Sequence, residues 1–325
     1  NIINWVHRST RGWSYGTTVA DPRTGEIIKG HVLLGSLRVR QDFLIAQGMV
    51  EAYETGQTAD PRLKEMALAR LRQLSAHEVG HTLGLAHNFA ASMNDRASVM
   101  DYPHPLLQLE QDGTVDFSTA YDTGIGAWDK LAIRYGYSVL PKGTKEQEAL
   151  NAILAEGIQR GLHYISDDGA RADGTAHPQA HLWDNGTSAP EELNRVMDLR
   201  WEALSRFGEA NIPVGQPMST LERVLTPLYL SHRYQVAGCS KLLGGYYYTY
   251  ALRGDGQPAI RSVPEPEQSA AMTALLRTVR PAELIIPADI LDLLPPQPMG
   301  YSRGREFFEP YTGTVFDPMA AAESA

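Results

Sequence analysis

Three histidines and one glutamate lie in a short stretch whose spacing suits metal chemistry. The run HEVGHTLGLAH spans residues 77–87, and a helix through its first half would put His77 and His81 on one face, with Cβ atoms about 5–6 Å apart. Gly84 can adopt the left-handed conformation that ends a helix and reverses the chain, which brings His87 back toward the same point. Three neutral imidazoles leave one position of a Zn²⁺ ion open, which is typical of a catalytic site.

Glu78 follows the first histidine but is turned by about 100° around the helix axis. We therefore expect its carboxylate to face the cleft beside the metal without binding it. From there it can take a proton from metal-activated water and pass it to a leaving amine. The four side chains predict a zinc ion bound by His77, His81 and His87, with Glu78 as the general base.

This stretch resembles the zinc signature of the metzincin clan of metallopeptidases. The clan has a tight methionine turn beneath the metal, and the run SVMDYP at 98–103 is similar to it. The resemblance implies that Met100 forms the apolar floor under the imidazoles. In the astacin and serralysin branches, a tyrosine two residues after that methionine can bind zinc and swing to the oxyanion. Tyr102 matches it by position, and a packed aromatic side chain in a turn is the alternative.

The helix at 129–136 is similar to the one that follows the Met-turn in several metzincins. More narrowly, the run 77–103 looks like the catalytic segment of large, little-characterised bacterial zinc metalloproteases. It implies a zinc-dependent endopeptidase that acts on a peptide or protein substrate outside the cytoplasm, in the periplasm or secreted. In the clan, an edge strand of the sheet pairs with an extended peptide. The segment Ile27–Leu34 is the candidate for that strand.

Composition excludes several other classes of protein. The 325 residues include 38 acidic and 29 basic side chains with a net charge of −9 and no Lys/Arg block, so nucleic acid is a poor partner. No apolar run reaches the roughly 18 residues of a membrane span. Cys239 is the single cysteine, which excludes an intrachain disulfide and a thiolate metal cage. Nothing in the composition indicates an oligomeric state.

Hydrophobic periodicity predicts where the elements lie. A turn sequence, DPRTG at 21–25, joins two of the expected strands into a hairpin. Helical patterns alternate with Pro/Gly-rich connections in the second half. We expect strands at 2–6, 13–19, 27–34 and 246–250, and helices at 37–54, 61–84, 122–136, 144–161, 189–208, 218–243 and 267–279.

These elements predict an α+β fold: a metzincin-like catalytic domain with a small sheet, a zinc-binding helix and a Met-turn, followed by a mostly helical C-terminal region. The catalytic core is expected at 1–137 and the helical region, packed on it, at 138–325. Because the sequence starts at Asn1 rather than Met, we expect it to belong to a longer product, with part of the sheet upstream.

The predicted function is hydrolysis of peptide bonds, with Glu78 as base and Tyr102 as a donor to the oxyanion. Two alternatives stay open: a zinc hydrolase of a non-peptide amide, and a non-catalytic zinc-binding interaction module. Elsewhere, Asp167, Asp168 and Asp173 do not match the EF-hand spacing and are interpreted as a solvated acidic turn. His104 is interpreted as a solvent-facing loop residue.

Overall fold

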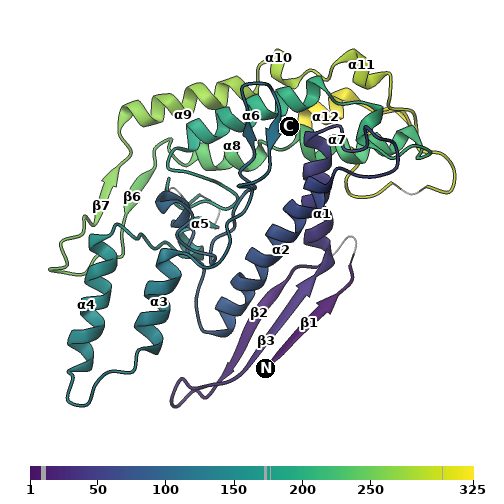
Figure 1. Ribbon diagram of the computed structural model, residues 1–325. Coiled ribbons are helices and arrows are strands. Elements are labelled where there is room, and N and C mark those ends of the chain that lie inside the picture. Colours follow the sequence, from purple (N-terminus) through teal and green to yellow (C-terminus); the bar gives the residue numbers. More distant parts are fainter. Residues whose placement is uncertain (9–11, 172–173, 176, 302) are drawn as a thin grey trace.

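The chain folds into a small sheet, one helix that lies against it, a second helix that packs on the first, and a larger helical assembly (Figure 1). More residues lie in helices than in strands, and the strands do not alternate with helices to form a parallel sheet. The expected α+β class is therefore confirmed. This computed structural model describes residues 1–8, 12–171, 174–175, 177–301 and 303–325.

The sheet contains the strands β1 (Ile2–Val6), β2 (Tyr15–Ala20) and β3 (Ile27–Gly35) in the order β1-β3-β2. β1 is parallel to β3, and β2 is antiparallel to it. The expected hairpin is present: Gly25 has φ +75° and its N–H donates to the Asp21 carbonyl at 2.8 Å.

The expectation that Ile27–Leu34 is an edge strand is wrong. β3 is the central strand, because β1 pairs with one of its sides and β2 with the other. Its backbone groups are therefore already used in the sheet. Within the described residues, β2 is the edge strand that packs against the histidine-bearing helix.

Two helices connect the sheet to the HEVGH motif. α1 (Ser36–Met49) ends earlier than the expected residue 54, because Asn211 Nδ2 takes the carbonyls of Gln47 (2.9 Å) and Val50 (2.8 Å) that would continue it. α2 (Pro61–Thr82) is capped at its N-terminus by Asp60, whose side chain accepts the Arg62 N–H at 2.8 Å.

Two of the later helices differ from the sequence expectation. The helix expected at 122–136 starts at Ala127 instead, because Asp122 pairs with Arg96 and does not cap a helix. The helix expected at 218–243 is two helices. The first, Leu221–Tyr229, packs on α1, and the second, Arg233–Ser240, packs on the helices Ala189–Ser205 and Glu265–Thr278. The other elements are β4 (Gln108–Leu109), β5 (Val115–Asp116), α3 (Ala127–Tyr137), α4 (Glu146–Gln159), α5 (Asp167–Ala170), α6 (Ala189–Ser205), α7 (Leu221–Tyr229), α8 (Arg233–Ser240), β6 (Tyr246–Tyr248), β7 (Ile260–Ser262), α9 (Glu265–Thr278), α10 (Pro281–Leu284), α11 (Ala288–Leu291) and α12 (Pro318–Ser324), with short 3₁₀ helices at Ala91–Asn94, Glu209–Asn211 and Met218–Thr220.

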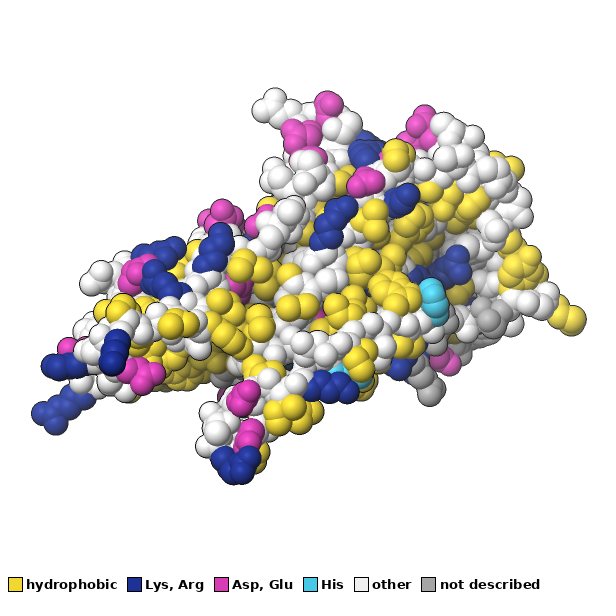
Figure 2. Space-filling model, turned by 60° about the horizontal axis from the view of Figure 1, so that its bottom comes forward, with side chains coloured by type: hydrophobic (Ala, Val, Ile, Leu, Met, Phe, Trp, Pro, Cys, Tyr) yellow, Lys and Arg dark blue, Asp and Glu magenta, His cyan; other side chains and the backbone are white. Residues whose placement is uncertain are grey.

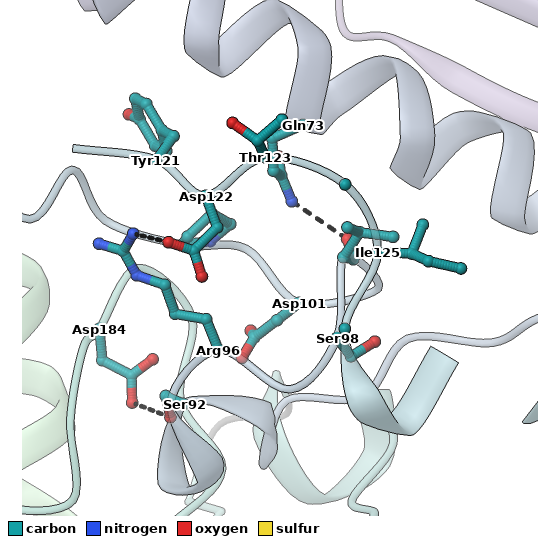
Figure 3. A pocket seen from close by; sticks show the side chains of 14 residues that line it. Gln73, Ser92, Arg96, Ser98, Asp101, Tyr121, Asp122, Thr123, Ile125 and Asp184 are labelled. Carbon is teal, nitrogen blue, oxygen red and sulfur yellow. Dashed lines mark hydrogen bonds and ion pairs between the residues drawn. The ribbon is translucent and has the colours of Figure 1, made fainter. Parts of the chain in front are cut away.

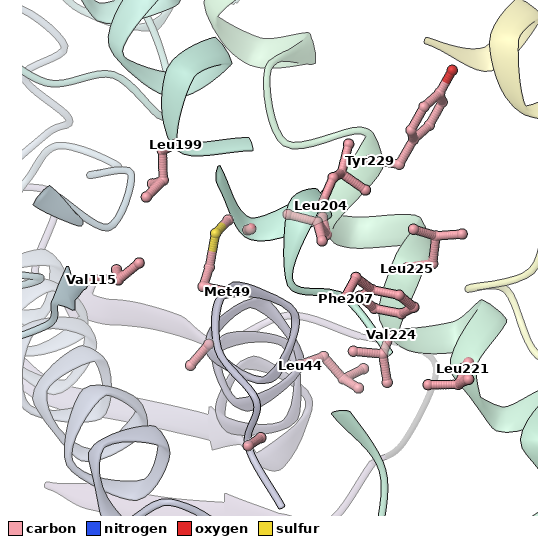
Figure 4. Packing of buried hydrophobic residues seen from close by; sticks show 14 of the residues in the cluster. Leu44, Met49, Val115, Leu199, Leu204, Phe207, Leu221, Val224, Leu225 and Tyr229 are labelled. Carbon is pink, nitrogen blue, oxygen red and sulfur yellow. The ribbon is translucent and has the colours of Figure 1, made fainter. Parts of the chain in front are cut away.

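The largest apolar cluster joins the early and late parts of the chain. Leu44 and Met49 of α1 are buried with Leu221 and Leu225 of α7 in one cluster (Figure 4). Both sides of the expected boundary at 137/138 thus contribute to one core, and the division into two regions stays a prediction.

Apolar surface is also exposed on the molecule. Ile3 and Ile28 of the sheet are each 67 % exposed. In the view of Figure 2, apolar side chains gather across the middle of the face and charged side chains lie mostly toward its margins. None of the described helices combines the length and hydropathy needed to cross a bilayer.

Replacing Leu225 by Ala should destabilise the whole chain. Its side chain is fully buried in the shared cluster, and such a truncation costs about 2–5 kcal/mol of unfolding free energy. Urea denaturation measures the loss. The control is Leu252→Ala, at a side chain that is 74 % exposed and should cost less than about 0.5 kcal/mol. Equal losses in the two variants would contradict the assignment of Leu225 to the core.

Candidate metal centre

Three imidazole nitrogens converge at the end of α2. His81 Nε2 lies 3.1 Å from His77 Nε2 and 3.2 Å from His87 Nε2. Two nitrogens bound to one zinc ion at 2.0–2.1 Å and near-tetrahedral angles would be about 3.3–3.4 Å apart. These three residues form a group that could hold a metal ion, as their spacing in the sequence predicts.

The other nitrogen of each ring is held by an oxygen acceptor. His77 Nδ1 lies 2.6 Å from the Val99 carbonyl, and His81 Nδ1 lies 2.9 Å from the Leu85 carbonyl. His87 Nδ1 lies 2.8 Å from a carboxylate oxygen of Asp167. A ring whose Nδ1–H donates a hydrogen bond keeps its lone pair on Nε2. All three rings therefore present an Nε2 lone pair to the same point.

The protonation of the rings also suits a cation. Burial lowers the pKa of His77 well below its usual value, and the neighbouring His81 lowers it further. Burial likewise lowers the pKa of His87, although Asp167 opposes the shift. Neutral imidazole is the form that binds zinc, so this donor set fits the ion that the sequence predicts.

Two glycines let the chain make this arrangement. Gly84 has φ +84°, and α2 ends at Thr82, which confirms the expected reversal before His87. Gly80 faces Met100, and a Cβ at this position would overlap the Met100 sulfur. Met100 is fully buried in this contact, so it lies against the zinc-binding helix as the Met-turn resemblance implies.

Asp129 holds the turn that carries Met100. Its buried carboxylate accepts the Ser98 hydroxyl at 2.5 Å and the Val99 N–H at 2.8 Å. It also accepts the Gly126 N–H at 2.7 Å, which joins the turn to the start of α3. Asp129 thereby fixes the position of Val99, whose carbonyl oxygen lies at hydrogen-bond distance from His77 Nδ1.

Glu78 lies beside the three rings and is only 3 % exposed. Burial raises the pKa of its carboxyl to about 7, although the Gly16 N–H and Arg70 act in the opposite direction. Gly16 in β2 packs directly on α2, where a Cβ would overlap the backbone of Glu78 and meet the His81 side chain. The edge strand therefore lies next to the glutamate.

Tyr102 packs against the histidines from the other side. Its ring centroid lies 5.3 Å from that of His77 and 5.0 Å from that of His87. The ring centroids of Phe89 and Trp183 lie 5.4 and 5.2 Å from that of Tyr102. The ring is thus part of the metal centre's wall, and a role for its hydroxyl stays a prediction.

A sequence profile of the family described as Met-zincin matches residues 59–325. That region includes the three histidines, the reversal at Gly84 and the turn at Met100. The chain belongs to the Met-zincin family. Members of this family are zinc-dependent metallopeptidases. No curated protein and no solved structure matches the chain.

Asp167, whose carboxylate contacts His87, is a residue of the site that the sequence of this Met-zincin did not reveal. Asp167 lies 80 residues after His87 and was expected in a solvated acidic turn; its side chain is 42 % exposed, but it begins the short helix α5 and contacts His87, which the sequence did not predict. It forms an ion pair with Arg171 at 2.5 Å and accepts from the imidazole. Asp168 is exposed, as expected for the turn, and Asp173 lies outside the described residues. No local signal marks such a distant partner.

A second pair of carboxyl groups lies behind the Met-turn of this Met-zincin. Asp101 and Asp184 line a cavity of about 70 Å³, with Ser92 3.2 Å from one Asp184 oxygen (Figure 3). Burial raises the pKa of Asp101 to about 7, and burial together with Asp101 raises that of Asp184. Neither carboxyl belongs to the three-histidine group, and Asp101 accepts the Tyr102 N–H at 2.6 Å within the turn.

Replacing Asp167 by Asn should weaken zinc binding. Loss of a carboxylate that orients a metal-binding imidazole typically costs about 10–100-fold in metal affinity. Competition with a chromophoric chelator measures the dissociation constant without any activity assay. Asp168→Asn is the matched control, since the exposed neighbour has the same charge. An unchanged affinity in the Asp167 variant would remove Asp167 from the metal centre.

Proposed function

We propose that this Met-zincin is an endopeptidase in which His77, His81 and His87 hold zinc and Glu78 is the general base. The observation that carries the proposal is the convergence of the three Nε2 atoms beside a buried glutamate. Zinc held there would supply Lewis-acid activation of water and of the scissile carbonyl.

Glu78 performs the proton transfers in this proposal. Its carboxylate takes a proton from the attacking water and then delivers it to the leaving amine. A pKa raised to about 7 by burial suits both directions of transfer near neutral pH. Tyr102 donates its hydroxyl to the developing oxyanion, from a ring already packed against His77 and His87.

The edge strand β2 supports a peptide as the substrate. One side of β2 pairs with β3, and its Gly16 N–H is directed at Glu78. An extended peptide can add to a free strand edge through main-chain hydrogen bonds. A peptide laid along β2 would therefore pass the glutamate and the three histidines. A small non-peptide amide would make no use of this edge, and a non-catalytic module would not need Glu78.

Replacing Glu78 by Gln should retain zinc and lose cleavage. The amide keeps the shape of the side chain but cannot accept the proton, and loss of a general base typically lowers turnover by about 10²–10⁴-fold. A casein or peptide-library digest, with and without chelator, measures activity, and metal analysis measures zinc. Glu65→Gln, at an exposed position of the same helix, is the control and should cut like wild type. A Glu78 variant that cuts at the wild-type rate would contradict the proposal.

Replacing Tyr102 by Phe tests the oxyanion role. Removing one such donor should lower kcat by about 10²–10³-fold while zinc content stays the same, because the ring still packs on the histidines. Steady-state kinetics on a quenched peptide give kcat. Tyr135→Phe, at a partly exposed tyrosine of α3, is the control. If kcat is the same in both variants, Tyr102 is a packing residue only.

A further inference from the structure

A cavity of about 480 Å³ lies between α1, α6, α7 and the loop after the Met-turn. Its size falls in the range of ligand pockets. One part of its wall is apolar and includes Leu107, Leu199 and Leu230. The metal centre does not account for this cavity.

Four arginines line the same cavity: Arg38, Arg195, Arg233 and Arg305. The first two are neutralised, Arg38 by Asp42 at 2.7 Å and Arg195 by Glu192 at 2.6 Å. Arg233 and Arg305 are exposed, and within the described part of the chain they form no ion pair. The acidic side chain in the lining, Glu306, is bound to Arg40. Two uncompensated positive charges thus lie at the exposed margin of a cavity whose wall is partly apolar.

His104 is a buried, uncharged part of the cavity wall. It was expected to face solvent, which is wrong, because its Nδ1 is buried and has no partner within the described residues. Burial lowers the pKa of His104 to about 3; Arg195 and Arg38 act in the same direction and Asp42 in the opposite one. The ring is therefore neutral and offers no positive charge of its own to a ligand.

Trp183 connects the cavity to the metal centre. It lines the cavity, and its ring lies 5.2 Å from that of Tyr102 and 5.0 Å from the Arg38 guanidinium. Its backbone has φ +66°, a conformation that a bulky residue rarely adopts, and its N–H donates to the Tyr102 carbonyl at 2.7 Å. Strain of this kind is kept where the surrounding structure needs one side-chain position.

The direction of β2 tells which part of a peptide reaches the cavity. Ser14, just before β2, accepts the N–H of Gly35, just before α1, at 3.1 Å. The beginning of β2 therefore lies beside the first turn of α1, which carries Arg38. A peptide antiparallel to β2, the more stable pairing, would run from Ala20 toward Tyr15, with its C-terminal half leading to the cavity.

We propose that this cavity binds a carboxylate of the substrate on the C-terminal side of the scissile bond, through Arg233 and Arg305. The inference rests on the proposed endopeptidase function and adds the substrate class to it. The carboxylate is supplied by an Asp or Glu side chain or by the C-terminus of a short substrate. The apolar wall contacts the methylene groups or the neighbouring side chain.

A library of quenched peptides tests the proposal. Wild type should prefer Glu over Gln by about tenfold in kcat/KM at one of the positions that follow the scissile bond, as expected for a charge-assisted hydrogen bond. In the Arg233→Gln/Arg305→Gln variant the ratio should fall to about one. Arg280→Gln, at an exposed arginine outside this cavity, is the control and should keep the wild-type ratio. Peptides with a free or amidated C-terminus distinguish the two sources of the carboxylate.

Three results would overturn the proposal: no preference for the acid in wild type, selection of the acid before the scissile bond, or an unchanged ratio in the double variant. Calorimetry separates this failure from failure of the proposed function. Glu and Gln peptides are titrated into the Glu78→Gln variant with and without the two arginine changes. If wild type cuts no peptide, the endopeptidase proposal fails, and about tenfold weaker binding of the Gln peptide would still support the cavity as a carboxylate site.

Discussion

The metal centre depends on the orientation of three imidazole rings. An oxygen acceptor at Nδ1 fixes the tautomer and the orientation that present Nε2 to a metal, and the three acceptors come from different parts of the chain. They are the carbonyls of Val99 and Leu85 and the carboxylate of Asp167. The Met-turn, the reversal after α2 and the short helix α5 must therefore be in place together.

This requirement explains why the late part of the chain belongs to the site. The Met-turn is held by Asp129 of α3, and α5 brings Asp167 to His87. Trp183 closes the wall behind Tyr102. A small apolar cluster of Phe89, Ile165 and Ala170, with Tyr102 packed against it, joins these segments. Residues on both sides of the expected boundary at 137/138 therefore contribute to the metal centre, and the match of the Met-zincin profile to 59–325 extends over both sides.

Burial shapes the chemistry of the centre as much as geometry does. The same exclusion of water raises the pKa of Glu78 and lowers that of His77. A carboxyl that is easily protonated and imidazoles that stay neutral are what a site for proton transfer beside a cation needs. The neighbouring cavity is lined by four arginines instead. The metal centre and this cavity lie on the two sides of the Tyr102–Trp183 pair.

The sequence by itself determined what is set by neighbours along the chain. The spacing of His77 and His81, the reversal at Gly84 and the hairpin at Gly25 follow from helix periodicity and backbone freedom. Only the tertiary structure decided what depends on segments far apart. It made β3 a central strand and brought Asp167 to His87. It also ended α1 at Met49, where Asn211 binds the carbonyl of the next residue, Val50. Such contacts follow from the packing of whole elements, which leaves no local pattern in the residues that meet.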